Sequence, residues 1–263
     1  MTKTKNCDIE YQDKSFPAYH VFPEAENSDQ TGEISGKKHP GLILIHEVWG
    51  LTDHIKDVAN RFAGEGFSVL APDLLSETGI TEKIDQSIMV AIQDPKTTPE
   101  ERDELQKKMR AAMAPTQSPE FGTETVEKLK ECVSYLLADE NVSDSVGVLG
   151  FCFGGSYAYQ LAAADPRIKL AVPFYGHAPE PLDLLETVSC PIFAFYGGVD
   201  ERLMNQLPNV EKKMAELGKK FEATVYPGAK HAFFNDSNPT TYNKEAAEDA
   251  WKKVLPILHE HLG

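Results

Sequence analysis

Hydrophobic and polar positions follow two different patterns along the chain. Between about residues 8 and 22 they alternate, which predicts two short antiparallel strands. Beyond Gly41, short unbroken apolar runs replace the alternation, and such runs are typical of parallel strands buried on both faces. The runs lie at about residues 41–45, 67–71, 145–149, 169–175, 192–196 and 221–226.

Segments with helical spacing separate these runs. The first predicted helix begins after Thr52, which can cap its N-terminus, and ends at the glycines 64 and 66. Further helices are expected at about residues 100–113, 123–138, from Phe153, and at about 243–261. The alternation predicts an α/β fold in which a mostly parallel, twisted sheet carries helices on both faces.

Two segments interrupt this pattern. Residues 24–38 are polar and rich in glycine, serine and aspartate, which predicts a surface loop. Residues 76–119 contain four prolines and one charged helix, and we expect them to form a helical and loop insertion over one end of the sheet. The length of 263 residues suits a single domain, 1–263, that contains this insertion.

Composition restricts the possible partners. Hydrophobic residues make up 41% and charged residues 25%, as in globular proteins, and the net charge of −15 argues against nucleic-acid or anionic-membrane partners. The apolar runs are far shorter than the roughly 20 residues that span a bilayer, and the N-terminus has no hydrophobic signal core. We therefore expect a cytoplasmic protein that is monomeric or weakly self-associating.

The most informative segment runs from residue 146 to residue 158. An apolar strand leads into Gly150-Phe-Cys152-Phe-Gly154-Gly155 and directly into a helix of small residues. This is the arrangement of a nucleophile elbow, with cysteine where serine usually stands. The glycines leave room for the neighbouring backbone, and the helix N-terminus directs N–H groups at the sulfur, which favours a thiolate.

The other cysteines lack this context. Cys7, Cys132 and Cys190 are scattered without a CxxC pair, so neither a zinc site nor a disulfide framework is indicated. We expect them to be small buried side chains. The sequence His259-Glu-His261 resembles a metal pair, but its place near the end of an amphipathic helix favours a solvated face. No metal and no cofactor is therefore expected.

Two further strand ends carry candidate partners for Cys152. Asp200 follows the apolar run at 192–196 and His231 follows the run at 221–226, which is the chain order nucleophile, acid, base of elbow enzymes. Each residue alone could equally be a turn aspartate or a surface histidine. Together they predict that Cys152 attacks a carbonyl, His231 moves the proton and Asp200 orients the imidazole.

Residues 46–50, His-Glu-Val-Trp-Gly, follow the first apolar run, where an elbow enzyme places its second oxyanion donor. We assign the two donors to the backbone N–H groups of Val48 and Phe153. Glu47 is an ionisable group at the mouth of this strand, although a surface carboxylate with a capping role is the alternative. Trp49 and Phe233 are candidates to line a substrate pocket, although aromatic residues at strand ends often belong to the core.

These pieces together resemble the dienelactone hydrolase family of the α/β-hydrolase fold. The matching segments are residues 46–50, 150–155, 196–200 and 228–233. The resemblance implies a Cys152–His231–Asp200 triad that hydrolyses a lactone or small ester through a thioester, without a cofactor. It also implies that Glu47 pairs with the resting thiol and takes its proton when substrate binds.

One position departs from the family pattern. Family members that act on dienelactone carry a carboxylate-binding arginine four residues after the catalytic histidine, where this chain has Asn235. A second such arginine would lie in the insertion, where Arg102 and Arg110 are candidates. We therefore expect Asn235 in the substrate site and neutral substrates to be used at least as well as anionic ones. One alternative is a carboxylesterase of neutral esters. The others are a thiol redox sensor or a non-catalytic binding protein on the same fold. The absence of a clear resolving cysteine near Cys152 argues against the redox sensor.

Overall fold

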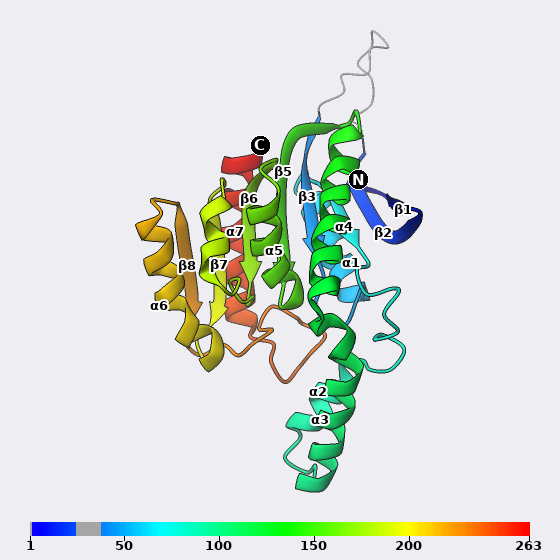
Figure 1. Cartoon of the computed structure of the whole chain (residues 1–263), viewed down its shortest axis with the longest axis vertical. Coiled ribbons are helices and arrows are strands. Elements are labelled where there is room, and N and C mark those ends of the chain that lie inside the picture. Colours follow the sequence, from blue (N-terminus) through cyan, green and yellow to red (C-terminus); the bar gives the residue numbers. More distant parts are fainter. Residues whose placement is uncertain (1, 25–37) are drawn as a thin grey trace.

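The computed structural model describes residues 2–24 and 38–263 (Figure 1), so the loop predicted at 24–38 lies outside the described residues except for its two ends. Eight strands form one sheet in the order β1-β2-β4-β3-β5-β6-β7-β8. They are β1 (Thr2–Tyr11), β2 (Lys14–Pro23), β3 (His39–Ile45), β4 (Ser68–Pro72), β5 (Val142–Phe151), β6 (Ile168–Phe174), β7 (Ile192–Gly197) and β8 (Phe221–Tyr226).

The helices follow the strands in alternation, as the sequence predicts. They are α1 (Asp53–Gly64), α2 (Ser87–Gln93), α3 (Pro99–Met113), α4 (Pro119–Ala138), α5 (Phe153–Ala164), α6 (Glu201–Glu216) and α7 (Lys244–Leu262), with 3-10 turns η1 (Ala114–Gln117) and η2 (Leu182–Thr187). Strands β3 to β8 are parallel, and the β1–β2 hairpin joins β4 in antiparallel pairing. The predicted α/β architecture is confirmed.

The unbroken apolar runs arise because the central strands are covered on both faces. In β3, Leu42 and Leu44 lie in one core with residues of α1 and α7, whereas Ile43 and Ile45 lie in a second core with residues of α4 and α5. All four side chains are fully buried. Successive side chains of a strand point to opposite faces, so burial of both faces removes the polar alternation.

Strand β1 is longer than the pattern predicts. It begins at Thr2, which pairs with Pro23, rather than near residue 8. Residues 2–6 are all exposed, because β1 is an edge strand whose outer half covers no core. The polar side chains of residues 2–6 therefore do not indicate a strand, because this part of β1 is held only by its backbone pairing to β2.

The arm, which we define as residues 75–113, contains helices α2 and α3, which lie beyond the ends at which the parallel strands terminate (Figure 1). It has a small core of its own, formed by Leu75, Ile80, Ile84, Ile88 and Ala112. Helix α3 confirms the prediction at 100–113, whereas α2 was not predicted and α4 begins at Pro119 rather than near 123.

Helix N-termini explain part of these differences. Thr98 forms a capping box with Glu101 at the start of α3, and the Ser118 hydroxyl accepts a hydrogen bond from the Phe121 amide at the start of α4. Thr52 lies at the predicted cap of α1, but its side chain makes no capping hydrogen bond. Within residues 2–24 and 38–263, no helix combines the length and apolar character needed to cross a bilayer.

Candidate active site

The turn between β5 and α5 has the geometry of the predicted elbow. Cys152 adopts φ 54° and ψ −109°, a conformation that L-residues rarely take, and its amide donates to the Phe174 carbonyl at 3.0 Å. A Cβ on Gly150 would lie 2.1 Å from the Gly154 oxygen, and one on Gly154 would lie 2.2 Å from the Ile45 oxygen. The glycines are thus required by close backbone contacts on both sides of the cysteine.

The predicted acid and base meet at the same edge of the sheet. Asp200 follows β7 and begins α6, and His231 follows β8. The Nδ1–H group of His231 donates to Oδ2 of Asp200 at 2.5 Å. Asp200 also accepts a hydrogen bond from the Leu203 amide, which fixes its carboxylate at the helix N-terminus.

The charged forms of His231 and Asp200 support one another. Burial opposes a charge on His231, but the negative charges of Cys152 and Asp200 and the hydrogen bonds to them outweigh it and raise the pKa of His231 to about 10. Burial likewise opposes a charge on Asp200, yet the hydrogen bond and charge of His231 hold the pKa of Asp200 below its ordinary value. The arrangement favours the charged imidazolium of His231 beside the Asp200 carboxylate.

The other three cysteines have different surroundings. Cys132 and Cys190 are buried, and Cys7 is half-buried. Burial raises the pKa of all three thiols, to about 11 for Cys190. These thiols stay protonated near neutral pH, in agreement with the structural role predicted for them.

His46 fixes the loop that follows β3. It is fully buried, its Nδ1–H donates to the Glu47 carbonyl at 2.6 Å, and its Nε2 accepts from the Leu74 amide at 3.1 Å. Burial lowers the pKa of His46, so the ring is neutral and makes both bonds. Its own carbonyl accepts from the Gly154 amide at 3.1 Å, which joins this loop to the elbow helix. No sequence motif indicates this role of His46.

Two backbone amides beside the elbow are free. Among the described residues, neither the Val48 amide nor the Phe153 amide donates a hydrogen bond to another protein group. Val48 follows the loop fixed by His46, and Phe153 is the first residue of α5. Free donors at a helix N-terminus and an adjacent loop are what an oxyanion site requires.

Glu47 lies in a buried polar cluster, with 3% of its surface exposed. Its Oε1 accepts a hydrogen bond from the Tyr175 hydroxyl at 3.3 Å, and its Oε2 accepts one from the Asn235 amide at 2.5 Å. Burial raises the pKa of Glu47, whereas the charges of His54 and His231 and these two hydrogen bonds favour its ionised form. No hydrogen bond joins Glu47 to Cys152 within the described parts of the chain, so the expected pairing with the thiol is not present.

A cavity of about 280 Å³ opens above these groups. On one side lie Glu47, Val48, Cys152 and His231, and three residues of the loop after β8 also contribute: Ala232, Asn238 and Thr241. The remaining wall is apolar, and it consists of Trp49 together with Met89, Met109 and Met113 of the arm. The cavity therefore lies between the carboxyl edge of the sheet and the arm.

The comparisons with known proteins agree with this geometry. The family profile described as "Dienelactone hydrolase family" matches residues 30–262. The chain belongs to the dienelactone hydrolase family.

Individual relatives cover nearly the whole chain. Proteins of Saccharolobus solfataricus (32% identical over 90% of this chain and 96% of theirs) and Escherichia coli K12 (25% over 97% and 86%) are both named "Putative carboxymethylenebutenolidase". The crystal structure titled "Putative Dienelactone Hydrolase" from Klebsiella pneumoniae superposes with a TM-score of 0.74, at 25% identity over 97% of this chain and 98% of that one. The fold is thus the α/β-hydrolase fold, and the family is one of hydrolases that act on ester bonds.

Two predicted substrate-binding residues lie outside the lining of this cavity. Phe233 is fully buried, with its ring 5.5 Å from Tyr175 and 5.1 Å from Tyr226, so it belongs to the core. Asn235 is 1% exposed and does not line the cavity, because its amide is directed at Glu47. Trp49, by contrast, lines the cavity as predicted.

The two candidate arginines of the insertion also lie outside the cavity lining. The Arg102 guanidinium donates to the carbonyl oxygens of Asp94 and Thr97, both at 3.2 Å, and so holds the link between α2 and α3. Arg110 is exposed on α3. The described cavity wall contains neither an arginine nor a lysine.

Several residues at the site were not singled out from the sequence. Tyr175 follows β6 with φ 38°, and its position at the end of the strand beside the elbow is the signal that would identify it. His54 in α1 has no catalytic motif, yet its Nδ1 lies 2.9 Å from Asp236 beside the Glu47 cluster. The sequence pattern places Met89, Met109 and Met113 in the insertion but indicates no role for them.

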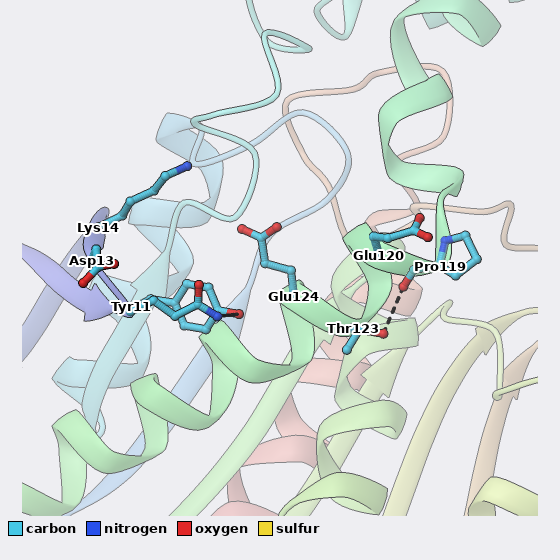
Figure 2. A pocket seen from close by; sticks show the side chains of 8 residues that line it. Tyr11, Asp13, Lys14, Pro119, Glu120, Thr123 and Glu124 are labelled. Atoms are coloured by element: carbon cyan, nitrogen blue, oxygen red, sulfur yellow. Dashed lines mark hydrogen bonds between the residues drawn. The ribbon is translucent and has the colours of Figure 1, made fainter.

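A second hollow lies away from all of these residues. It measures about 580 Å³ and is open, between the turn after β1 and the start of α4 (Figure 2). Asp13, Glu120 and Glu124 are among its lining residues, and Figure 2 shows Glu120 and Glu124 on α4 and Asp13 in the turn after β1. No group of three or more His, Cys, Asp or Glu side chains that could hold a metal occurs in the described residues.

Proposed function

We propose that this dienelactone hydrolase relative cleaves lactones or small carboxylic esters with Cys152 as nucleophile and a thioester as intermediate. The observation that carries the proposal is that Cys152, on the strained elbow, lies beside His231, whose Nδ1 is 2.5 Å from Oδ2 of Asp200. In the other three cysteines, by contrast, burial raises the pKa of the thiol.

The proposed reaction has two halves. The Cys152 thiolate attacks the carbonyl carbon, and the negative charge that develops on oxygen is stabilised by the amides of Val48 and Phe153. Collapse of this intermediate breaks the carbon–oxygen bond, and His231 donates its proton to the leaving alkoxide. Neutral His231 then takes a proton from water, which attacks the thioester carbonyl and releases the acid and the thiolate.

We assign Glu47 an electrostatic role in this scheme. Its hydrogen bonds to Tyr175 and Asn235 support its ionised form within a buried site, where it affects the charge balance around His231. A carboxylate held in this way stabilises the imidazolium that the first half of the reaction needs. Transfer of the thiol proton to Glu47 would need a rearrangement that brings the two groups together.

The test is turnover of p-nitrophenyl acetate with and without iodoacetamide. We expect alkylation to abolish hydrolysis, and mass spectrometry of the Asp200→Asn variant with substrate to detect an acyl group on Cys152. Cys190→Ala serves as the control variant and should remain sensitive to iodoacetamide. Hydrolysis that survives alkylation of Cys152 would overturn the cysteine mechanism. Lack of hydrolysis together with reversible oxidation of Cys152 would favour the redox-sensor alternative.

We further propose that residues 1–263 act as one domain with 76–119 as its insertion, in a monomer or weak homo-oligomer. The contact of Trp49 and Phe153 with the arm core supports this organisation. A cytoplasmic location suits a chain whose four cysteines are all free, because reducing compartments keep thiols unpaired.

A further inference from the structure

Three methionines of the arm face the reacting groups across the cavity. Met89 belongs to α2, and Met109 and Met113 are four residues apart on α3, hence on the same helix face. All three are partly exposed and pack against the arm core. They therefore connect the packing of the arm with the shape of the cavity.

The cavity offers little to a negatively charged substrate. Its described lining contains Glu47 and Cys152 but no lysine or arginine, and its cationic group, His231, is already paired with Asp200. A substrate carboxylate would lose its hydration here without a compensating partner. The net charge of −15 also repels anions as they approach.

We propose that Met89, Met109, Met113 and Trp49 form the acyl-binding wall and select uncharged, apolar acyl groups. This inference rests on the proposed function, since it assigns the substrate class of the same site. Methionine side chains are flexible and adapt to irregular shapes, so the wall accepts several short acyl groups rather than one. The volume of about 280 Å³ limits these groups to small ones, because it lies at the lower end of ligand pockets, which span roughly 300–1,000 Å³.

The charge preference is tested with mono-p-nitrophenyl adipate and its methyl ester, which release the same leaving group and differ in one negative charge. We expect the wild type to show kcat/KM for the methyl ester at least about tenfold above that for the anion, because the anion lacks a partner. Met109→Lys should shift this ratio toward the anion by about tenfold or more, since a cation then faces the carboxylate. Ala111→Lys is the matched control, because it adds the same charge to an exposed position of α3 outside the cavity lining.

The shape of the wall is tested with p-nitrophenyl acetate, butyrate and hexanoate. Met109→Ala and Met113→Ala should each raise the hexanoate-to-acetate ratio of kcat/KM by about fivefold or more, because truncation makes room for extra methylenes. Met204→Ala in α6, which removes a partly buried methionine away from the cavity, should leave the ratio within about twofold. Circular dichroism confirms that each variant is folded.

The outcomes separate the two proposals. A wild-type enzyme that hydrolyses none of these esters contradicts the proposed function itself. An enzyme that hydrolyses them but prefers the anion overturns the inference while the function stands. The inference is also overturned if Met109→Lys and Ala111→Lys shift the charge ratio equally, or if neither truncation changes the chain-length ratio.

Discussion

The carboxyl edge of the sheet and the arm form opposite sides of one cavity, yet they are built in different ways. Cys152, Asp200 and His231 each follow a strand of a hydrogen-bonded sheet, and a Cβ at Gly150 would lie 2.1 Å from the neighbouring backbone. The arm has a core of five buried residues and presents flexible methionines. Cys152, Asp200 and His231 thus stand on the rigid part of the molecule, and the methionine wall of the cavity stands on the adaptable part.

Replacement of the nucleophile tests the rigid side most strongly. Cys152→Ala should abolish thioester formation and lower kcat by about 10⁵-fold or more, close to the loss in His231→Ala, because the members of a triad act as a unit. Ester hydrolysis by both single variants and by the double variant measures this non-additivity. Cys190→Ala should retain activity. Loss in Cys190→Ala with retention in Cys152→Ala would contradict the assignment.

Asp200→Asn should preserve the fold but lower kcat by about a thousandfold to ten-thousandfold, because the imidazole loses its orienting carboxylate.

The pH profile of the Asp200→Asn variant should differ from that of the wild type as well. Protonated His231, with a pKa of about 10, is the acid for an alkoxide leaving group, so the wild type should lose activity on ethyl esters as the pH rises through about 10.

The Asp200 carboxylate is one of the groups that raise this pKa, so the decline should move to lower pH in Asp200→Asn. p-Nitrophenyl esters are the control, since their leaving group needs no proton. A decline at the same pH in the wild type and the variant would show that another group sets the alkaline limb.

Tyr175→Phe tests the support of Glu47 and should have an intermediate effect. It removes the hydroxyl that donates to Glu47 at 3.3 Å, and kcat/KM should fall about tenfold, the size of one hydrogen bond to a charged group. In a Glu47→Gln background the same change should cost much less, which a double-mutant cycle measures.

The matched control is Tyr19→Phe, which removes a hydroxyl that donates to Asn60 at 3.0 Å outside the site. An equal loss in Tyr19→Phe, or a full tenfold loss in the Glu47→Gln background, would mean that Tyr175 does not act through Glu47.

Thr98→Ala should have the smallest effect and tests the independence of the arm. It breaks the capping box with Glu101, which stabilises a helix by about 1 kcal/mol. Amide hydrogen exchange should become roughly fivefold faster in α3 and stay unchanged in α5. Equal acceleration in both helices would show that arm and sheet open together, and would contradict the independent stability of the arm.

Local patterns were sufficient to predict the sheet and the meeting of Cys152, Asp200 and His231 at one edge of it. The apolar runs at 41–45 and 145–149 predicted buried strands because both faces of those strands are covered. The Gly-x-Cys-x-Gly motif predicted the strained turn because few residues tolerate such backbone contacts. Residues that follow successive parallel strands meet at one edge, so chain order alone brought Asp200 and His231 toward Cys152.

Long-range packing decided what local patterns could not. Asn235 and Phe233 are near His231 in sequence, which suggested contact with substrate, but the fold directs Asn235 at Glu47 and buries Phe233 beneath Tyr175. Edge strand β1 begins at Thr2 although its outer half is polar, because backbone pairing needs no apolar side chains.

The sequence by itself therefore determined the α/β architecture, the elbow and which three side chains meet at the carboxyl edge of the sheet. Only the tertiary structure decided which arm residues face them and how Glu47 is held. The physical reason is that the end of a parallel strand has a fixed position at the carboxyl edge of the sheet once the strand order is set. A helical arm can present any of its faces, and the face it presents is chosen by packing between residues far apart in the chain. Met109 and Trp49, for example, are 60 positions apart and pack against the same core.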